Sequence, residues 1–296
     1  MFRSPIPKIF LSVCARWTRI SRSVTGSAPV SSMEGLNSSN PLAGDFLVLL
    51  KRHQLINNAS PIPARHLEFK ETTATTILGF KFAGGVLVAG DRRATAGNVV
   101  MYDRADKVLE IDRHSVMAIA GSPATAWEMA RILEHSFQYY RRTQLQEMSV
   151  EGKVRALSKL LRDNLGMVMQ GVGVVVPLFA TYEKKSSEPA KLFFYDAMGA
   201  QFEATDFASS GSGASAVRSV LYYENSWGLQ PLRERSREEA ILLALKALDT
   251  AAEADTATGG VDRHGKIFPI VKIVSELGIE TVADNKLSEL FQTQVA

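Results

Sequence analysis

The sequence of 296 residues contains a single cysteine, Cys14, which excludes a disulfide framework and a cysteine-ligated zinc site and suits a reducing compartment. Long apolar runs are also missing. The longest candidate, residues 172–180, contains Pro177 and falls short of the roughly 18 apolar residues of a membrane-spanning helix. The five histidines never fall at the spacing of metal ligands. We therefore expect a soluble protein with no bound metal and no membrane partner.

The formal net charge of +3 is unevenly distributed along the chain. Residues 1–74 contain nine lysines and arginines against four acidic residues, whereas the rest contains 25 against 27. A nucleic-acid-binding domain would carry its positive charge on the folded surface. The near balance of charge in residues 75–296 therefore argues against nucleic acid as a partner.

The first residues read as a leader. Residues 1–32 contain five basic residues, many serines and no acidic residue, which superficially matches an organellar transit peptide. Met33 offers an alternative start, in which case residues 1–32 are never translated, and the sequence does not decide between the two. Polar and proline-rich sequence continues to residue 74, and sequence rich in strand-forming residues begins at Thr75. We predict a leader, or propeptide, over residues 1–74 and one folded domain over residues 75–296.

The folded region alternates between groups of strands and pairs of helices. Two β-rich runs around Ala83-Gly84 predict a hairpin, Ser122-Pro123 predicts a helix start, and Ser236 with Glu239 matches a capping box. No regular strand–helix–strand alternation is present, so we expect an α+β fold with antiparallel sheets covered by helices. The predicted strands span 75–82, 85–89, 115–120, 172–182, 191–196, 201–207 and 266–274, and the predicted helices 123–137, 150–168, 214–223, 236–252 and a short one from 286.

One motif suggests a cofactor. Residues 211–216, Gly-Ser-Gly-Ala-Ser-Ala, match the weaker form of the dinucleotide-binding fingerprint. That fingerprint belongs near the start of a parallel sheet, whereas here it follows strands that look antiparallel. The sequence also lacks a P-loop and the G-x-S-x-G turn of many hydrolases. We therefore expect no cofactor.

A set of short motifs, taken together, is far more specific than any of its members. The folded region opens with the doublet Thr75-Thr76, and five blocks follow it in order: Gly90-Asp91-Arg92-Arg93-Ala94-Thr95, Lys107-Val108, Ile119-Ala120-Gly121, Ser210-Gly211-Ser212-Gly213 and Asp255-Thr256-Ala257-Thr258-Gly259-Gly260. From Thr75 to about residue 289, this set resembles catalytic β-subunits of the bacterial, actinobacterial-type proteasome core particle. The resemblance implies the N-terminal-nucleophile hydrolase fold, a four-layer αββα sandwich of two antiparallel sheets.

The chemistry of such a site can be understood from the residue types. A threonine hydroxyl is a weak nucleophile, but the α-amine of an N-terminal threonine, with a pKa of roughly 7.7 to 8.0, could serve as its base. A nearby lysine held by an acid would disfavour protonation of that amine. The resemblance gives the nucleophile role to Thr75, and assigns the remaining catalytic roles as follows: Lys107 with Asp91 as the lysine–acid pair, Gly121 as oxyanion donor, and Ser212, Asp255 and Thr258 as the hydrogen-bonding group around the amino terminus.

Taken singly, these residues have ordinary structural interpretations. Lys107 stands among charged neighbours and would pass for a solvated surface lysine, and Asp91 for a turn residue after a strand. Ser212 would be a loop serine and Asp255 a helix-terminal acid. Only their joint occurrence favours the catalytic interpretation.

Two threonine doublets compete for the role of nucleophile, Thr72-Thr73 and Thr75-Thr76. Asp91 lies 16 and Lys107 32 positions after Thr75, as the family pattern requires, whereas Thr72 misses this register by three. The small residue Ala74 also leaves the preceding carbonyl accessible. We therefore predict cleavage between Ala74 and Thr75.

The resemblance also places a substrate pocket. Its lining positions carry no charge, so we expect chymotrypsin-like cleavage after apolar side chains, although Asp106 could reach the pocket if the strand register differs by one. The pocket positions are Ala94, Thr95, Ala105, Leu109, Ile119, Pro123 and Trp127.

The family further implies partners and a location. A β-subunit would work in the cytoplasm within stacked seven-membered rings, beside α-subunits and other β-subunits, on unfolded proteins delivered by an ATPase ring. Two alternatives remain open: an HslV-type ATP-dependent peptidase subunit, and a non-catalytic ring subunit on the same fold.

Overall fold

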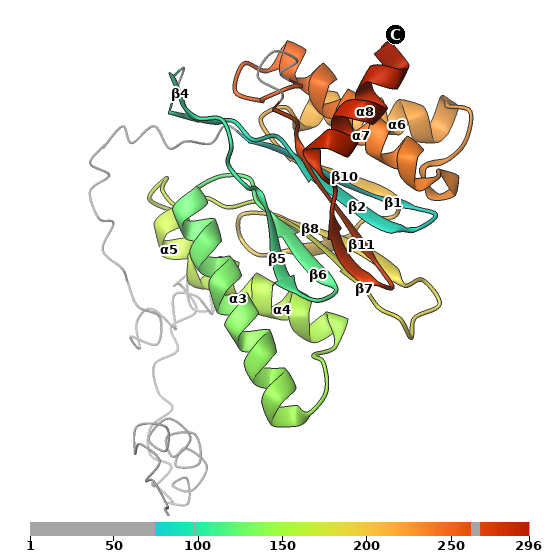
Figure 1. Ribbon diagram of the computed structural model, residues 1–296. Coiled ribbons are helices and arrows are strands. Elements are labelled where there is room, and N and C mark those ends of the chain that lie inside the picture. The colour runs from blue at the N-terminus through green and yellow to red at the C-terminus, as the bar shows by residue number, and fades with distance from the viewer. Residues whose placement is uncertain (1–74, 97–98, 262–266, 296) are drawn as a thin grey trace, which may run out of the picture. The chain divides into compact units, whose positions relative to one another are not determined.

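Two five-stranded antiparallel sheets form the centre of the folded region. The computed structural model describes residues 75–96, 99–261 and 267–295. Within these ranges the sheets pack face to face, and helices cover the outer face of each (Figure 1). The predicted α+β fold, a four-layer αββα sandwich, is therefore confirmed. The predicted leader over residues 1–74 lies outside the described residues.

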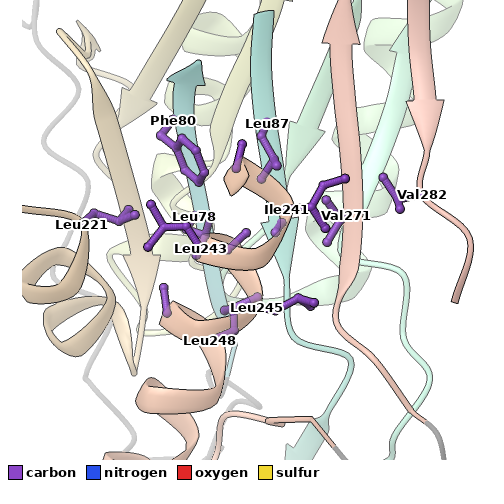
Figure 2. Packing of buried hydrophobic residues seen from close by; sticks show 14 of the residues in the cluster. Leu78, Phe80, Leu87, Leu221, Ile241, Leu243, Leu245, Leu248, Val271 and Val282 are labelled. Atoms are coloured by element: carbon purple, nitrogen blue, oxygen red, sulfur yellow. The ribbon is translucent and has the colours of Figure 1, made fainter. Parts of the chain in front are cut away.

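The first sheet is covered by three helices. One hydrophobic cluster joins its strands to these helices, and Figure 2 shows Leu78 and Leu87 on the side that faces Ile241 and Leu245. β1 is buried along its whole length because the second sheet covers its other face. The sheet order is β10 (Phe207–Gly211), β1 (Thr76–Phe82), β2 (Gly85–Gly90), β11 (Ile270–Ser275), β12 (Gly278–Thr281), and the helices are α6 (Ala214–Trp227), α7 (Arg237–Ala254) and α8 (Asp284–Val295).

The second sheet is covered mainly by two helices from the middle of the chain. A second cluster joins this sheet to α3 and α4, and a third fills the space between the two sheets. The sheet order is β5 (Val108–Asp112), β6 (Ser115–Ala118), β7 (Leu178–Tyr182), β8 (Ala190–Tyr195), β9 (Gln201–Glu203). The remaining elements are α3 (Pro123–Gln144), α4 (Val150–Asp163), α5 (Leu165–Val168), a 3-10 turn (Leu232–Glu234) and the two-stranded ribbon β3 (Ala94–Ala96) and β4 (Val99–Tyr102).

Local signals located several elements correctly. The hairpin of β1 and β2 turns at Ala83-Gly84, and α3 begins directly after Ser122. At the start of α7 the Ser236 hydroxyl accepts a bond from the Glu239 amide, and the Glu239 carboxylate accepts one from the Ser236 amide at 2.8 Å. Such caps stabilise a helix by about 1 kcal/mol because they satisfy amides that have no partner inside the helix.

Other predicted boundaries were wrong for identifiable reasons. The strand predicted over 172–182 begins only at Leu178: Gly173 has left-handed backbone, with φ of 67°, and Val175 forms only an isolated bridge with Gly121. The helix predicted over 150–168 is interrupted at Asn164, between α4 and α5, where the Asn164 side-chain amide donates to the Gly173 carbonyl at 2.7 Å. The strand predicted over 201–207 is two strands, β9 and β10, which belong to different sheets. The strand predicted over 266–274 begins at Ile270.

No helix in the described ranges is long and apolar enough to cross a membrane.

Candidate active site

The predicted catalytic residues come from the ends of several elements. Thr75 directly precedes β1 and is 5% exposed. Asp91 follows β2, Lys107 precedes β5, Ser212 follows β10 and Asp255 caps the C-terminus of α7. The ends that carry Thr75, Asp91 and Ser212 meet because β1 pairs with β2 on one side and with β10 on the other, with Thr76 opposite Gly211. Lys107 and Asp255 join them through hydrogen bonds to Asp91 and Ser212.

Asp91 is fully buried, and both of its carboxylate oxygens are hydrogen-bonded. Oδ1 accepts bonds from the Thr76 amide and from Lys107 Nζ, each at 2.8 Å. Oδ2 accepts bonds from the amides of Arg93 and Gly259, each at 3.0 Å. Burial of a carboxylate is costly unless its lone pairs are satisfied by hydrogen bonds in this way. Asp91 is therefore a buried anchor for four segments of chain, not an exposed turn residue.

Lys107 is also buried, at 4% exposure, and is not a solvated surface lysine. Its ammonium donates to Asp91 and also to the carbonyl of Arg93. Burial lowers the pKa of Lys107 below its ordinary value, and the charge of Asp91 partly opposes this effect. The result is an ammonium held in a fixed place that gives up its proton more readily than a surface lysine.

Asp255 is the centre of a second hydrogen-bonded group. Its Oδ2 accepts bonds from Ser212 Oγ at 2.5 Å and Thr258 Oγ1 at 2.6 Å, and its Oδ1 accepts one from the Ala257 amide at 3.1 Å. Burial raises the pKa of Asp255, but the bonds from Ser212 and Thr258 outweigh it and hold that pKa below its ordinary value. Asp255 is therefore an anion at neutral pH, and Ser212, Asp255 and Thr258 form one group.

Gly121 has a backbone conformation that suits glycine alone. Its φ is 107°, and a Cβ at this position would lie 2.0 Å from the carbonyl oxygen of Val174. The neighbouring bonds run from the Ser122 amide to Val174 at 2.7 Å and from the Val176 amide to Ala120 at 2.9 Å. These two bonds flank the Gly121–Val175 bridge, so the bridge does not use the Gly121 N–H. Among the described residues no group accepts a bond from that amide, which can therefore donate to another acceptor.

Two residues of the site were not singled out from the sequence. Thr76 is fully buried, and its hydroxyl lies 2.5 Å from Thr258 Oγ1 and accepts a bond from the Gly213 amide at 2.9 Å. The Arg93 guanidinium donates to the carbonyls of Thr256 and Thr258, at 3.0 and 3.2 Å. Both residues stand inside motifs that carried the family resemblance, which was the available signal.

The glycines of the dinucleotide-like motif have a different explanation. Gly211 has a φ of 101°, and a Cβ there would lie 1.7 Å from the Thr75 carbonyl oxygen. A Cβ at Gly213 would lie 2.6 Å from Thr76 Oγ1. Both positions therefore need glycine because the chain that carries Thr75 and Thr76 passes so close.

The predicted pocket residues lie on neighbouring segments. Ala94 and Thr95 lie on β3, and the Ala105 amide donates to the Arg92 carbonyl at 3.0 Å. The Ile119 amide donates to the Lys107 carbonyl at 2.9 Å, and Pro123 is the first residue of α3.

Leu109 and Trp127 line one cavity of about 410 Å³, together with five charged side chains. Lys272 Nζ lies 3.1 Å from the Glu110 carboxylate and 3.6 Å from that of Asp106. Asp106 also accepts a bond from the Val108 amide at 2.9 Å, so its carboxylate is already partnered. The charged residues of this cavity are Asp106, Glu110, Arg131, Glu134 and Lys272.

In the described part of the chain, no three histidine, cysteine or acidic side chains lie together in a way that could hold a metal ion.

Comparison with known proteins points to one family. A family model described as "Proteasome subunit" matches residues 71–267. A protein of Streptomyces griseus named "Proteasome subunit beta" is 36% identical over 249 residues, which are 83% of this chain and 84% of the relative. Proteins of the same name from Streptosporangium roseum and Acidimicrobium ferrooxidans are 40% and 38% identical, over 74% and 73% of this chain and 75% and 76% of the relatives. The chain belongs to the proteasome subunit family.

Proposed function

We propose that this chain is a catalytic β-subunit of a proteasome core particle, a threonine endopeptidase whose nucleophile is Thr75. The observation that carries the proposal is the buried Asp91–Lys107 pair, which is hydrogen-bonded to the backbone of the residue directly after Thr75. A surface lysine or a turn aspartate would not be organised in this way. The relatives named "Proteasome subunit beta" favour this function over an HslV-type peptidase.

The proposed reaction begins with cleavage of the Ala74–Thr75 bond, which turns the Thr75 amide into a free α-amine. This amine, directly or through a water, takes the proton from Thr75 Oγ1 as the oxygen attacks the substrate carbonyl carbon. The Gly121 N–H donates to the oxygen that becomes negative. The peptide C–N bond then breaks, the leaving amine takes the proton, and water hydrolyses the ester that remains on Thr75.

The other groups have supporting roles in this proposal. The Lys107 ammonium, held by Asp91, stabilises negative charge on the attacking oxygen and disfavours a protonated α-amine. Asp255, with Ser212 and Thr258, surrounds the amino terminus with hydrogen-bonding groups. Removal of the leader would need a different base, because the Thr75 nitrogen is then an amide. Thr75 Oγ1 would attack the Ala74 carbonyl while a water takes the hydroxyl proton, the Ala74–Thr75 C–N bond would break as the nitrogen receives a proton, and water would hydrolyse the ester that remains.

The family implies assembly with other proteasome subunits in stacked rings. We propose seven-membered rings of this chain stacked on α-subunits, fed with unfolded protein by an ATPase ring in the cytoplasm. Residues 1–74 would be the leader that is removed when the particle matures, and residues 75–296 the peptidase domain.

We propose a preference for apolar side chains before the cleaved bond. The seven pocket positions are uncharged, and Lys272 partners Asp106, the acid beside them. In the cavity that Leu109 and Trp127 line, Glu110 also pairs with Lys272, and Glu134 accepts a bond from Gln138. A lysine or arginine side chain would therefore lose hydration there without gaining an unpartnered carboxylate. Fluorogenic peptides ending in Tyr, Arg or Glu should therefore differ in kcat/KM, with the Tyr peptide cleaved fastest, and faster cleavage of the Arg peptide would refute this preference.

The decisive experiment uses the full chain co-expressed with its α-subunit. Intact mass and N-terminal sequencing of assembled particles should show a mature chain that begins at Thr75. Thr75→Ala should abolish both peptide hydrolysis and removal of the leader, whereas Thr72→Ala, at the competing doublet, should leave both intact. A Thr75→Ala particle with near wild-type hydrolysis would contradict the proposed nucleophile. Assembled wild-type particles that keep the leader and hydrolyse no peptide would instead indicate a non-catalytic ring subunit.

A further inference from the structure

Thr76 joins the two carboxylate groups of the site. On one side, its amide donates to Asp91 Oδ1 at 2.8 Å and its carbonyl accepts a bond from the Asp91 amide at 3.0 Å. On the other side, its hydroxyl contacts Thr258, which is bonded to Asp255. The side chain is fully buried, so these partners are not exchanged for bulk water. Thr76 thus contacts both the Asp91–Lys107 pair and the Asp255 group.

The direction of each hydrogen bond in this group can be assigned. An ionised carboxylate only accepts, so Thr258 must donate its single hydroxyl hydrogen to Asp255. Thr258 Oγ1 must then accept from Thr76, whose own oxygen accepts from the Gly213 N–H at 2.9 Å. The hydrogen bonds therefore form a series, in which the Gly213 amide donates to Thr76, Thr76 to Thr258, and Thr258 to Asp255. Each hydroxyl in it donates once and accepts once, and none can be replaced by a methyl group without breaking the series.

This series ends on the group that surrounds the start of the peptidase domain. Thr75 is one peptide bond from Thr76, and its carbonyl accepts a bond from the Ser212 amide at 3.0 Å. Ser212 Oγ shares Asp255 Oδ2 with Thr258. A shift of the Thr76 side chain would therefore move Thr258 and the Asp255 group relative to Asp91 and Lys107, which are held by the Thr76 backbone.

We propose that the Thr76 hydroxyl is a positioning group that sets the place of the Asp255 group, and through it of the Thr75 amine, relative to Lys107. This inference rests on the proposed function of Thr75. Thr76 acts through its neighbours and contacts neither substrate nor the reacting atoms. Because geometry governs the rate of the chemical step more than the affinity for substrate, its loss should lower kcat and leave KM nearly unchanged.

The test compares two substitutions in assembled particles. Thr76→Val keeps the shape of the side chain but removes the hydroxyl, and should lower kcat at least about tenfold. Thr76→Ser restores the hydroxyl and should recover most of the rate. The matched control is Thr181→Val, since Thr181 is another buried threonine on a strand, bonded to Ser115 Oγ at 2.9 Å away from the site, and it should keep the wild-type kcat.

The outcomes separate the possibilities. Wild-type kcat in Thr76→Val, or a loss that Thr76→Ser does not reverse, would overturn the inference while leaving the proposed function of Thr75 in place. A wild-type particle that hydrolyses no peptide would overturn both. If Thr76→Val fails to assemble because its methyl group crowds Thr258 Oγ1, Thr76→Ala removes the same hydroxyl without that crowding. It should lower kcat with KM unchanged, and unchanged kcat there would equally overturn the inference.

Discussion

Lys107 and Lys153 are both buried lysines paired with an aspartate, at 2.8 Å from Asp91 and 2.7 Å from Asp112. Asp91 is fully enclosed and accepts three backbone amides as well, whereas the side chain of Asp112 is 22% exposed. Lys153 also donates to Ser115 Oγ at 3.1 Å and thereby ties α4 to the hairpin of β5 and β6. A buried lysine–aspartate pair is therefore not by itself a sign of catalysis. What distinguishes Lys107 is that its partner Asp91 also accepts a bond from the Thr76 amide, next to the proposed nucleophile.

The largest difference between the two pairs should appear in activity. Lys107→Met should lower kcat by about 10²–10³-fold, because in the proposed mechanism it removes the charge that stabilises the attacking oxygen. Lys153→Met should keep near wild-type activity per assembled particle. Peptide hydrolysis, normalised to particles isolated by size exclusion, measures this contrast.

Stability provides the control for that experiment. Removal of one partner from a buried ion pair costs about 3–5 kcal/mol, and less where the other partner reaches solvent, so both variants should unfold at lower urea concentration than wild type. Equal losses of activity in the two variants would mean that Lys107 has only a structural role.

The second contrast concerns two glycines, one in the site and one outside it. A Cβ at Gly213 would lie 2.6 Å from Thr76 Oγ1, whereas a Cβ at Gly166, in α5, meets nothing within 4 Å. Gly213→Ala should therefore destabilise the fold by about 1–3 kcal/mol and reduce activity. Gly166→Ala should change activity little and stabilise by about 0.4–1 kcal/mol through the unfolded state. Urea unfolding and peptide hydrolysis of both variants test this, and a harmless Gly213→Ala would show that the contact is not tight.

The smallest expected effect is the pH dependence of stability that Lys107 contributes. Its pKa in the fold is lower than the ordinary value of 10.5, so between these two values the unfolded chain binds more protons than the folded one. Stability from this group therefore rises with pH across that interval and levels off above it. The stability advantage of wild type over Lys107→Met should grow as pH is raised toward 10.5, as measured by urea midpoints. A constant advantage would contradict the lowered pKa.

Much of the fold could be predicted because its signals are local. The start of α7 depends on two residues three positions apart, and the hairpin of β1 and β2 on a two-residue turn. β3, β4, β5 and β12 were not predicted. Every residue of β4 is exposed, so it lacks the alternation of buried and exposed residues that marks a strand. The division of β9 from β10 depends on how two sheets stack, which a short window of sequence does not contain.

The residues of the site, too, could be predicted only in part. The predicted residues were found through family motifs, and the structure brings Asp91, Lys107 and the Asp255 group around the start of β1. Thr76 was overlooked because its hydroxyl partners, Gly213 and Thr258, are 137 and 182 residues away along the chain. Threonine is common in buried strands, and only the positions of its hydrogen-bond partners in the fold distinguish the Thr76 hydroxyl from others.

The hydrogen bonds around Asp91 and Asp255 exist in a chain where Ala74 and Thr75 are still joined. In the proposed mechanism, maturation would then require no rearrangement of these groups. The precursor would be inactive toward substrates because the lone pair of the Thr75 nitrogen is delocalised into a peptide bond and cannot accept a proton. Activation would be a change of bonding at one atom, and its timing would depend on what brings the Thr75 hydroxyl to that bond.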